Sequence, residues 1–186
     1  ERLKKQKKAP VRVIIGNPPY SVGQKSANDN AQNLSYPHLD GRIAATYAKY
    51  STANSVKATY DSYIKAFRWA SDRIDKNGGI IAFITNGGWL DSNGMDGFRK
   101  TLESEFNSIY VFNLRGAIRG KAREDAKREG QNVFDIMTGV AITVLVKQPK
   151  SKTNQTTIYY HDIGDYLSRV DKLDILKKFK NITNKI

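Results

Sequence analysis

Short apolar runs alternate along this chain with longer stretches in which apolar residues recur every three or four positions. Five runs, each bounded by glycine, proline or polar residues, predict strands at residues 11–15, 80–84, 108–114, 139–146 and 156–161. The runs at 11–15 and 80–84 are typical of buried strands, whereas the last run follows a polar turn and predicts an edge strand. Apolar residues at helical spacing predict three helices, at residues 60–74, 95–106 and 167–179.

Strands that alternate with helices favour an α/β fold in which the helices pack on the sheet. Between the first strand and the next helix, residues 21–37 contain almost no apolar side chains. A loop of this length is usually functional or disordered. We therefore weigh a flap that orders around a substrate against disorder without function.

The composition limits the chemistry that is available. The chain has 186 residues, enough for one domain or part of one, and its hydrophobic content of 39% permits a core. With no cysteine and only two histidines, disulfides and thiolate metal sites are excluded, and we expect no metal site. No apolar run approaches membrane-spanning length and no signal-peptide pattern is present, so we expect no membrane contact and a cytoplasmic location.

The charge points to a class of partner. Lysine and arginine number 31 against 18 aspartate and glutamate residues, which gives a formal net charge of +13. Solubility alone is the alternative explanation, but this excess is larger than a small domain needs. We therefore expect a polyanionic partner and favour nucleic acid.

The residues directly after the first predicted strand carry the most distinctive chemistry. They are Asn17, Pro18, Pro19 and Tyr20, and the two prolines impose a rigid, extended path. The Asn17 amide oxygen and the Pro18 carbonyl are acceptors, and the Tyr20 ring is a stacking face. Such groups suit a planar ring that bears an amino group, and open α/β sheets bind ligands at the carboxyl ends of their strands. A plain loop start is the alternative, which the position after a buried strand disfavours.

Asn-Pro-Pro-Tyr after a hydrophobic strand resembles the catalytic motif of S-adenosylmethionine-dependent amino-methyltransferases, chiefly DNA adenine-N6 enzymes. The similarity extends over about residues 10–165. It is carried by the segments NPPYSVGQKSANDN, YPHLDGRI, YDSYIKAFRWASDRI, FITNGGWLD, SIYVFNLRG and GVAITVLVK. As an ordered set they resemble the methyltransferase part of single-chain restriction-modification enzymes, in which a helicase-like motor is fused to a methyltransferase.

This resemblance implies a fold and a boundary. The family fold is a Rossmann-like sheet of seven strands whose late strands include one antiparallel member, and this chain matches the fourth strand onwards. Residues 1–165 are then the carboxyl half of a methyltransferase catalytic domain, and 166–186 a closing helix or the start of a linker. The family's glycine-rich turn and ribose-binding acidic residue have no counterpart here. We therefore expect S-adenosylmethionine to be bound mostly upstream of Glu1, by the amino-terminal part of a longer protein, and the segment to be inactive alone.

The resemblance also suggests walls for a base pocket. Asn86 and Trp89 follow the second strand at the same sheet edge and, in the family, lie beside the catalytic loop. A tight strand–helix turn with Trp89 as a buried anchor is the alternative. Phe134 matches the aromatic residue that forms the opposite wall, although residues 135–138 match no family pattern, and ordinary core packing is its alternative.

Residues 115–131, here called the basic loop, contain three glycines and a group of cations. The cations are Arg115, Arg119, Lys121, Arg123, Lys127 and Arg128. The loop leaves the same sheet edge as residues 17–20, so we expect it to contact DNA phosphates. Solvation of an ordinary charged loop is the alternative.

Together these features predict methyl transfer from S-adenosylmethionine to the N6 amino group of an adenine that is flipped out of duplex DNA. Asn17 and Pro18 would accept the amino hydrogens and Tyr20 would stack on the ring, without a general base or a metal. One alternative is an amino-methyltransferase that acts on cytosine N4 or on a protein glutamine. The other is a non-enzymatic DNA-binding or scaffold segment.

Overall fold

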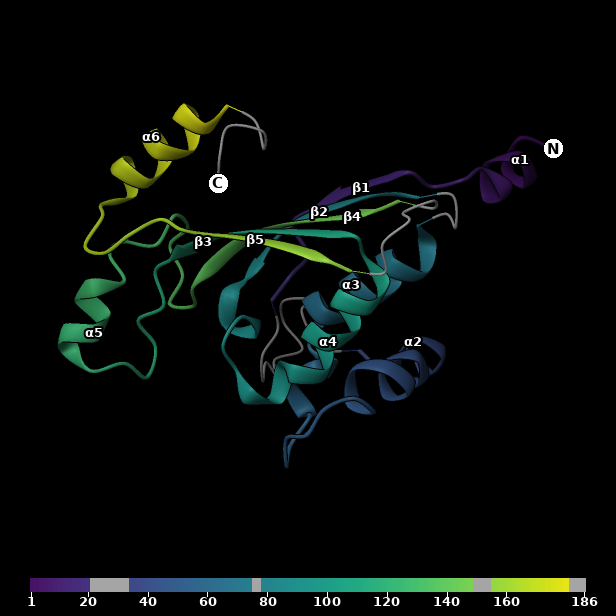
Figure 1. The fold of residues 1–186 in the computed structure, drawn as a ribbon, viewed down its shortest axis with the longest axis horizontal. Helices are drawn as coiled ribbons and strands as arrows, with labels where there is room; N and C mark the ends of the chain where they lie inside the picture. Colours follow the sequence, from purple (N-terminus) through teal and green to yellow (C-terminus); the bar gives the residue numbers. More distant parts are fainter. Residues whose placement is uncertain (21–33, 75–77, 149–154, 181–186) are drawn as a thin grey trace.

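The structure is a computed structural model that describes residues 1–20, 34–74, 78–148 and 155–180, apart from the side chains of residues 6–8. Most of the predicted flap, residues 21–33, therefore lies outside the described residues. Five strands form one sheet in the order β1-β2-β4-β3-β5 (Figure 1). They are β1 (Val13–Gly16), β2 (Gly79–Asn86), β3 (Ser108–Arg115), β4 (Val140–Lys147) and β5 (Thr157–Asp162).

Within the described sheet, β4 alone runs against the other strands. β1 pairs with β2, and β3 with β5, in parallel, whereas β4 is antiparallel to both of its neighbours, β2 and β3. This confirms the predicted α/β sheet with one late antiparallel member. Because β4 is reversed, its first residue, Val140, lies beside the last residues of the neighbouring strands, Asn86 of β2 and Arg115 of β3.

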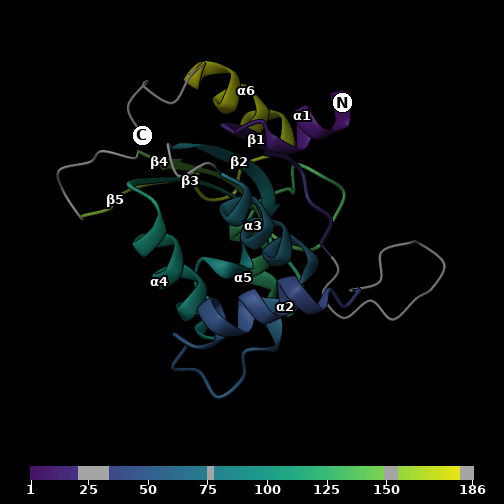
Figure 2. The same cartoon turned by 90° about the vertical axis from the view of Figure 1, so that its right-hand side faces the viewer.

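The helices cover the two faces of the sheet unequally, as Figures 1 and 2 show. On one side lie α2 (Pro37–Ile43), α3 (Ser62–Arg73) and α4 (Asp96–Glu105), and on the other lies α6 (Arg169–Phe179). α1 (Arg2–Lys8) precedes β1, and α5 (Arg123–Arg128) lies beyond the carboxyl ends of the strands. The shorter helical turns are η2 (Ala44–Ala48), η3 (Lys57–Tyr60), η4 (Gly87–Trp89) and η5 (Asn93–Met95).

The larger core lies between the sheet and the pair α3 and α4. Phe67 of α3 packs edge-on against Phe83 of β2, with ring centroids 5.1 Å apart. In the same layer Arg68 is 1% exposed and donates two hydrogen bonds of 2.9 Å to Glu105 of α4. A buried guanidinium is tolerated only when it is paired in this way, so the pair fixes α3 against α4 beneath β1 and β2.

A smaller core lies between the sheet and α6, where Phe179 packs against Phe112 of β3 at 5.1 Å. The helix begins with a capping box, in which Ser168 accepts from the Asp171 N–H and the Asp171 carboxylate accepts from the Ser168 N–H. The helices predicted at 60–74, 95–106 and 167–179 are therefore confirmed as α3, α4 and α6.

The first strand differs from its prediction. Residues 11–15 were expected to form a buried strand, but β1 spans only Val13–Gly16, and Val13 and Ile15 are 56% and 78% exposed. β1 is an edge strand, and its side chains alternate between the α3 side and an outer face on which Val13 and Ile15 stay open. Only every second residue of the run therefore enters the core.

Candidate functional site

The carboxyl edge of the sheet gathers the residues that the sequence singled out. Asn17 follows β1, Asn86 ends β2, and Arg115 ends β3. Phe134 precedes β4, which begins at this edge because it runs in reverse. Ligands of open α/β sheets bind at such an edge.

Residues 17–20 form an open corner at the end of β1. Asn17 and Pro19 are exposed, and Pro18 and Tyr20 are half-buried. The Tyr20 ring meets Tyr63 of α3 edge-on at 6.2 Å, and Ser62 Oγ donates to the Pro19 carbonyl at 3.0 Å. The corner is thus anchored on α3, while the Asn17 side chain remains accessible.

The corner offers a hydrogen-bond acceptor, the Asn17 amide oxygen, to a small polar ligand. The Tyr20 hydroxyl donates to Asn17 Oδ1 at 3.2 Å, a long bond that an incoming amino group can replace. Burial raises the pKa of the Tyr20 phenol, so the ring stays neutral at physiological pH. A neutral ring beside an exposed amide oxygen suits an aromatic ligand that bears N–H donors.

Asn86 and Trp89 form the turn after β2. Asn86 Oδ1 accepts from the Gly88 N–H at 2.8 Å and so caps the η4 turn. Trp89 is 3% exposed, and its ring packs edge-on against Phe98 of α4 at 5.3 Å. This arrangement favours the alternative of a tight turn with a buried anchor, and a contact of either residue with a base stays a prediction.

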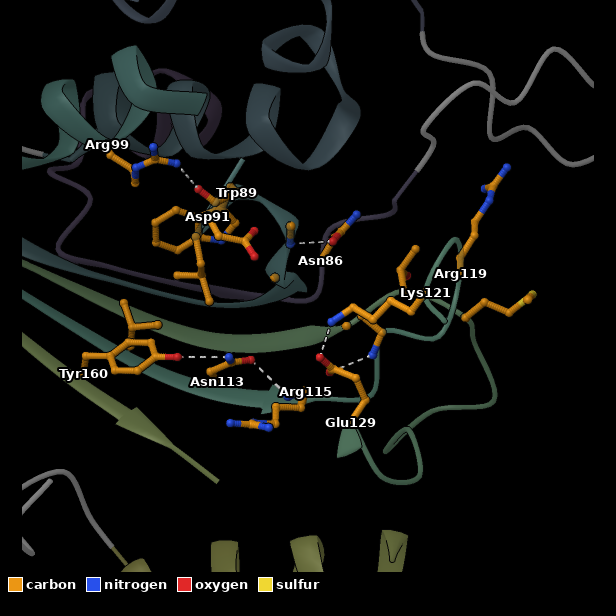
Figure 3. A pocket seen from close by; sticks show the side chains of 18 of the residues that line it. Asn86, Trp89, Asp91, Arg99, Asn113, Arg115, Arg119, Lys121, Glu129 and Tyr160 are labelled. Carbon is orange, nitrogen blue, oxygen red and sulfur yellow. Dashed lines mark hydrogen bonds and ion pairs between the residues drawn. The ribbon is translucent and has the colours of Figure 1, made fainter. Parts of the chain in front are cut away.

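A cavity of about 710 Å³ lies between this turn, α4 and the strands β3 and β5 (Figure 3). Its apolar lining includes Leu102 of α4 and Val111 of β3, and Tyr160 of β5 stands at one side. Asn86, Arg119 and Lys121 supply part of its polar lining. Residues 17–20 do not line it, so among the described residues this cavity is separate from the corner after β1.

Phe134 lies on a different cavity, of about 690 Å³, together with Ile136 and Arg169. Phe134 is 37% exposed, and its N–H donates to Asn132 Oδ1 at 2.9 Å. Phe134 is therefore at the predicted edge and accessible, rather than packed in the core. The strand that follows it, β4, is two strands from β1, about 10 Å across the sheet. The role of Phe134 as the opposite wall of a base pocket stays a prediction.

Most cations of the basic loop already have carboxylate partners. Arg115 pairs with Asp162 and Asp165, and Arg128 pairs with Asp165 as well. Lys121 pairs with Glu129, and Lys127 with Glu124. Within the described part of the chain, the guanidinium groups of Arg119 and Arg123 alone among the six have no hydrogen bond or ion pair, so they are the cations free to meet phosphate.

Asp162 and Asp165 are site residues that the sequence analysis did not single out. Burial alone would raise the pKa of Asp162, but hydrogen bonds from Arg115 and the Gly164 N–H outweigh it and hold that pKa below its usual value. The carboxylate therefore stays charged and fixes Arg115, whose φ of +56° is unusual for a side chain with a Cβ. Asp162 ends β5 and Asp165 follows it, and β5 is parallel to β3. Their place at the end of a predicted strand was the signal in the sequence that could have identified them.

Two kinds of site are not found in the described residues. No group of three or more histidine, cysteine, aspartate or glutamate side chains is placed to hold a metal ion there. Among the same residues, no helix has both the length and the apolar character needed to cross a membrane.

Comparison with known proteins gives a family and several related structures. Residues 4–117 match the family model described as Eco57I restriction-modification methylase. A search of curated proteins found no match. Among solved structures, the chain is similar to the ATP-dependent Type ISP restriction-modification enzyme LlaBIII bound to DNA, with 46% identity and a TM-score of 0.90 over 98% of this chain.

Two further structures agree with this likeness. A nuclease-deletion mutant of the Type ISP enzyme LlaGI in complex with a DNA substrate mimic is 46% identical over 100% of this chain, with a TM-score of 0.89. The DrdV–DNA complex is 43% identical over 95%, with a TM-score of 0.84. The chain spans only 12%, 15% and 17% of the LlaBIII, LlaGI and DrdV chains.

Proposed function

Because this chain belongs to the Eco57I restriction-modification methylase family, we propose that it is the catalytic-motif segment of a DNA methyltransferase that modifies adenine at N6. The observation that carries the proposal is the open corner at the end of β1. There Asn17 is exposed and Tyr20 is half-buried, and the Tyr20 ring and the Pro19 carbonyl contact α3 at the ligand-binding edge of the sheet.

The corner would act on the amino group of the base. The lone pair of an adenine amino nitrogen is delocalised into the ring, so the nitrogen is a poor nucleophile. The Asn17 side-chain oxygen and the Pro18 carbonyl each accept one N–H, which draws the nitrogen towards tetrahedral geometry and places negative dipoles where positive charge develops. Tyr20 stacks on the ring, a contact worth about 1–3 kcal/mol.

The methyl donor in this proposal is S-adenosylmethionine, which supplies an electrophilic methyl group. The segment offers the corner that would bind the amino group of the substrate. It has no glycine-rich turn after its first strand, the feature that would bind the donor. The chain's own part is to hold the amino nitrogen in position, and such positioning is a large part of catalysis.

The outer face of β1 suits a contact with another part of a longer chain. Val13, Ile15 and Ile80 form an apolar strip there, and they are 56%, 78% and 38% exposed. Strands of a parallel sheet are normally covered on both faces. We propose that the amino-terminal part of the parent protein covers this strip and carries most of the cofactor site.

Duplex DNA is the proposed substrate. The related LlaBIII and DrdV structures contain DNA, and the free cations Arg119 and Arg123 lie on the loop that leaves the same edge as the corner. Arg119 and Arg123 would bind DNA phosphates, without reading sequence. Arg115 and Lys121, which were predicted to touch DNA, would instead hold the loop in shape through their carboxylate partners.

The test uses the full-length parent protein and its Asn17→Ala variant. Mass spectrometry of nucleosides from treated duplex DNA should show 6-methyladenine with the wild type and a loss of at least about 100-fold with Asn17→Ala. DNA binding should be nearly unchanged in the variant. The appearance of 4-methylcytosine instead would favour the cytosine alternative, and near-normal 6-methyladenine with Asn17→Ala would favour a role in DNA binding only.

A further inference from the structure

Lys172 is a lysine of α6 that is fully buried, with 0% of its surface exposed. Lysine is rarely buried without a carboxylate partner, because its ammonium group loses water. Here Nζ donates to two backbone carbonyls, Leu114 O at 2.8 Å and Glu129 O at 2.9 Å. These two carbonyls lie at opposite ends of the basic loop, one at the end of β3 and the other after α5.

The connector between β5 and α6 makes further bonds to the same loop ends. The Gln131 N–H donates to the Leu167 carbonyl and the Tyr166 N–H to the Arg128 carbonyl, both at 2.9 Å. Gln131 Oε1 accepts from the Arg169 N–H at 2.8 Å, in the first turn of α6. The loop is therefore tied to the start of α6 by backbone as well as side chain.

Gly130 shows how close this contact is. Its φ of +67° favours glycine, and a Cβ at this position would collide with the Leu167 carbonyl. In the same connector, Asp165 pairs with both Arg115 and Arg128. Both ends of the basic loop thus rest on one short stretch of chain, residues 165–172.

We infer that Lys172 is a positioning residue, which fixes the basic loop so that Arg119 and Arg123 meet DNA phosphates in register with the corner after β1. This inference rests on the proposed function and deepens it. The lysine cannot contact DNA itself, because it is fully buried. Any effect of Lys172 on phosphate contacts therefore passes through the shape of the loop.

The experiment measures the salt dependence of DNA binding by the full-length protein. Fluorescence anisotropy with a labelled duplex, between about 50 and 200 mM KCl, gives the slope of log K against log salt, which changes by about 0.9 for each phosphate contact. We expect Lys172→Met and Arg119→Gln each to make the slope shallower by about one contact or more. The double variant should be little shallower than Lys172→Met, because both changes act on the same contacts.

A matched control separates position from charge. Lys177→Met removes the same charge from the exposed face of α6, where Lys177 pairs with Asp174. We expect the slope of this variant to equal that of the wild type. An equal loss of slope in Lys177→Met and Lys172→Met would overturn the inference, because charge alone would then explain both.

Gln131→Ala provides a second test of the same inference in case Lys172→Met does not fold. Gln131 is exposed and neutral, and its loss removes one bond between the loop and α6 without any change of charge. We expect a smaller loss of slope in the same direction, and if Lys172→Met does not fold, this variant decides alone. If Arg119→Gln makes the steep wild-type slope shallower but Lys172→Met and Gln131→Ala leave it unchanged, the positioning role is refuted. The proposed function would still stand.

Discussion

The two ends of the carboxyl edge are built in opposite ways. At the β1 end, residues 17–20 contact α3 through a hydrogen bond and a ring contact, and among the described residues the outer face of the strand is exposed. At the β3–β5 end, Arg115, Asp162 and Asp165 form ion pairs, and buried Lys172 ties the loop to α6. One end leaves its polar groups available, and the other uses most of them internally.

This contrast teaches that a cation count overstates the surface that is available to DNA. Four of the six cations predicted to bind phosphate are already paired with carboxylates. An ion pair can still accept a phosphate, but only after the guanidinium or ammonium group leaves its present partner. The open end, by contrast, can bind a ligand at the cost of one long hydrogen bond between Tyr20 and Asn17.

Beyond the loss expected for Asn17→Ala, the largest expected effect in this comparison is at Tyr20. In the full-length protein, Tyr20→Ala should lower kcat/KM for DNA methylation by about 10- to 100-fold, because a base–aromatic stack is worth about 1–3 kcal/mol. Tyr20→Phe keeps the ring and should stay close to the wild type. Methyl incorporation into duplex DNA measures both, and equal losses in the two variants would assign the effect to the hydroxyl instead of the ring.

A smaller effect is expected from the apolar strip on β1. If this strip is covered in the full-length protein, Ile15→Ser should lower the free energy of unfolding by about 1.5–3 kcal/mol, because a buried isoleucine contributes about that much. Ile158→Ser on β5, where Ile158 is 56% exposed, serves as the matched control and should change it by less than about 0.5 kcal/mol. Pulse proteolysis across a urea series measures both, and an equal effect at the two sites would contradict the contrast between the two ends.

The smallest effect concerns the pH dependence of stability at the β3–β5 end. The pKa of Asp162 is lowered in the folded state, so its carboxylate contributes stability above the unfolded carboxyl pKa, near about 3.9, and loses it as pH falls through the lower folded pKa. Asp162→Asn should therefore lower the urea midpoint at pH 7 and lower it less near pH 3. Unfolding curves at the two pH values measure this, and a difference that is undiminished in acid would show that the ion pair to Arg115 is not its source.

The amino-acid sequence by itself determined the elements and the chemistry of the open corner. Runs of β-branched residues and helical spacing are local signals, and β2, β3, β4, β5, α3, α4 and α6 lie where these signals predicted. The prolines of residues 17–20 fix the backbone locally too, so the placement of Asn17 and Tyr20 at an open strand end needed no long-range information. Their catalytic role remains a prediction.

Only the tertiary structure decided which groups are free. Arg115 meets Asp162 across 47 residues of chain, and Lys172 meets Leu114 across 58, because the sheet brings β3, β5 and α6 together. Spacing along the chain cannot reveal such partners, so it could not separate Arg119 and Arg123 from the paired cations. It could not reveal the bare face of β1 either, because an apolar run has the same pattern whether one or both faces of its strand are covered.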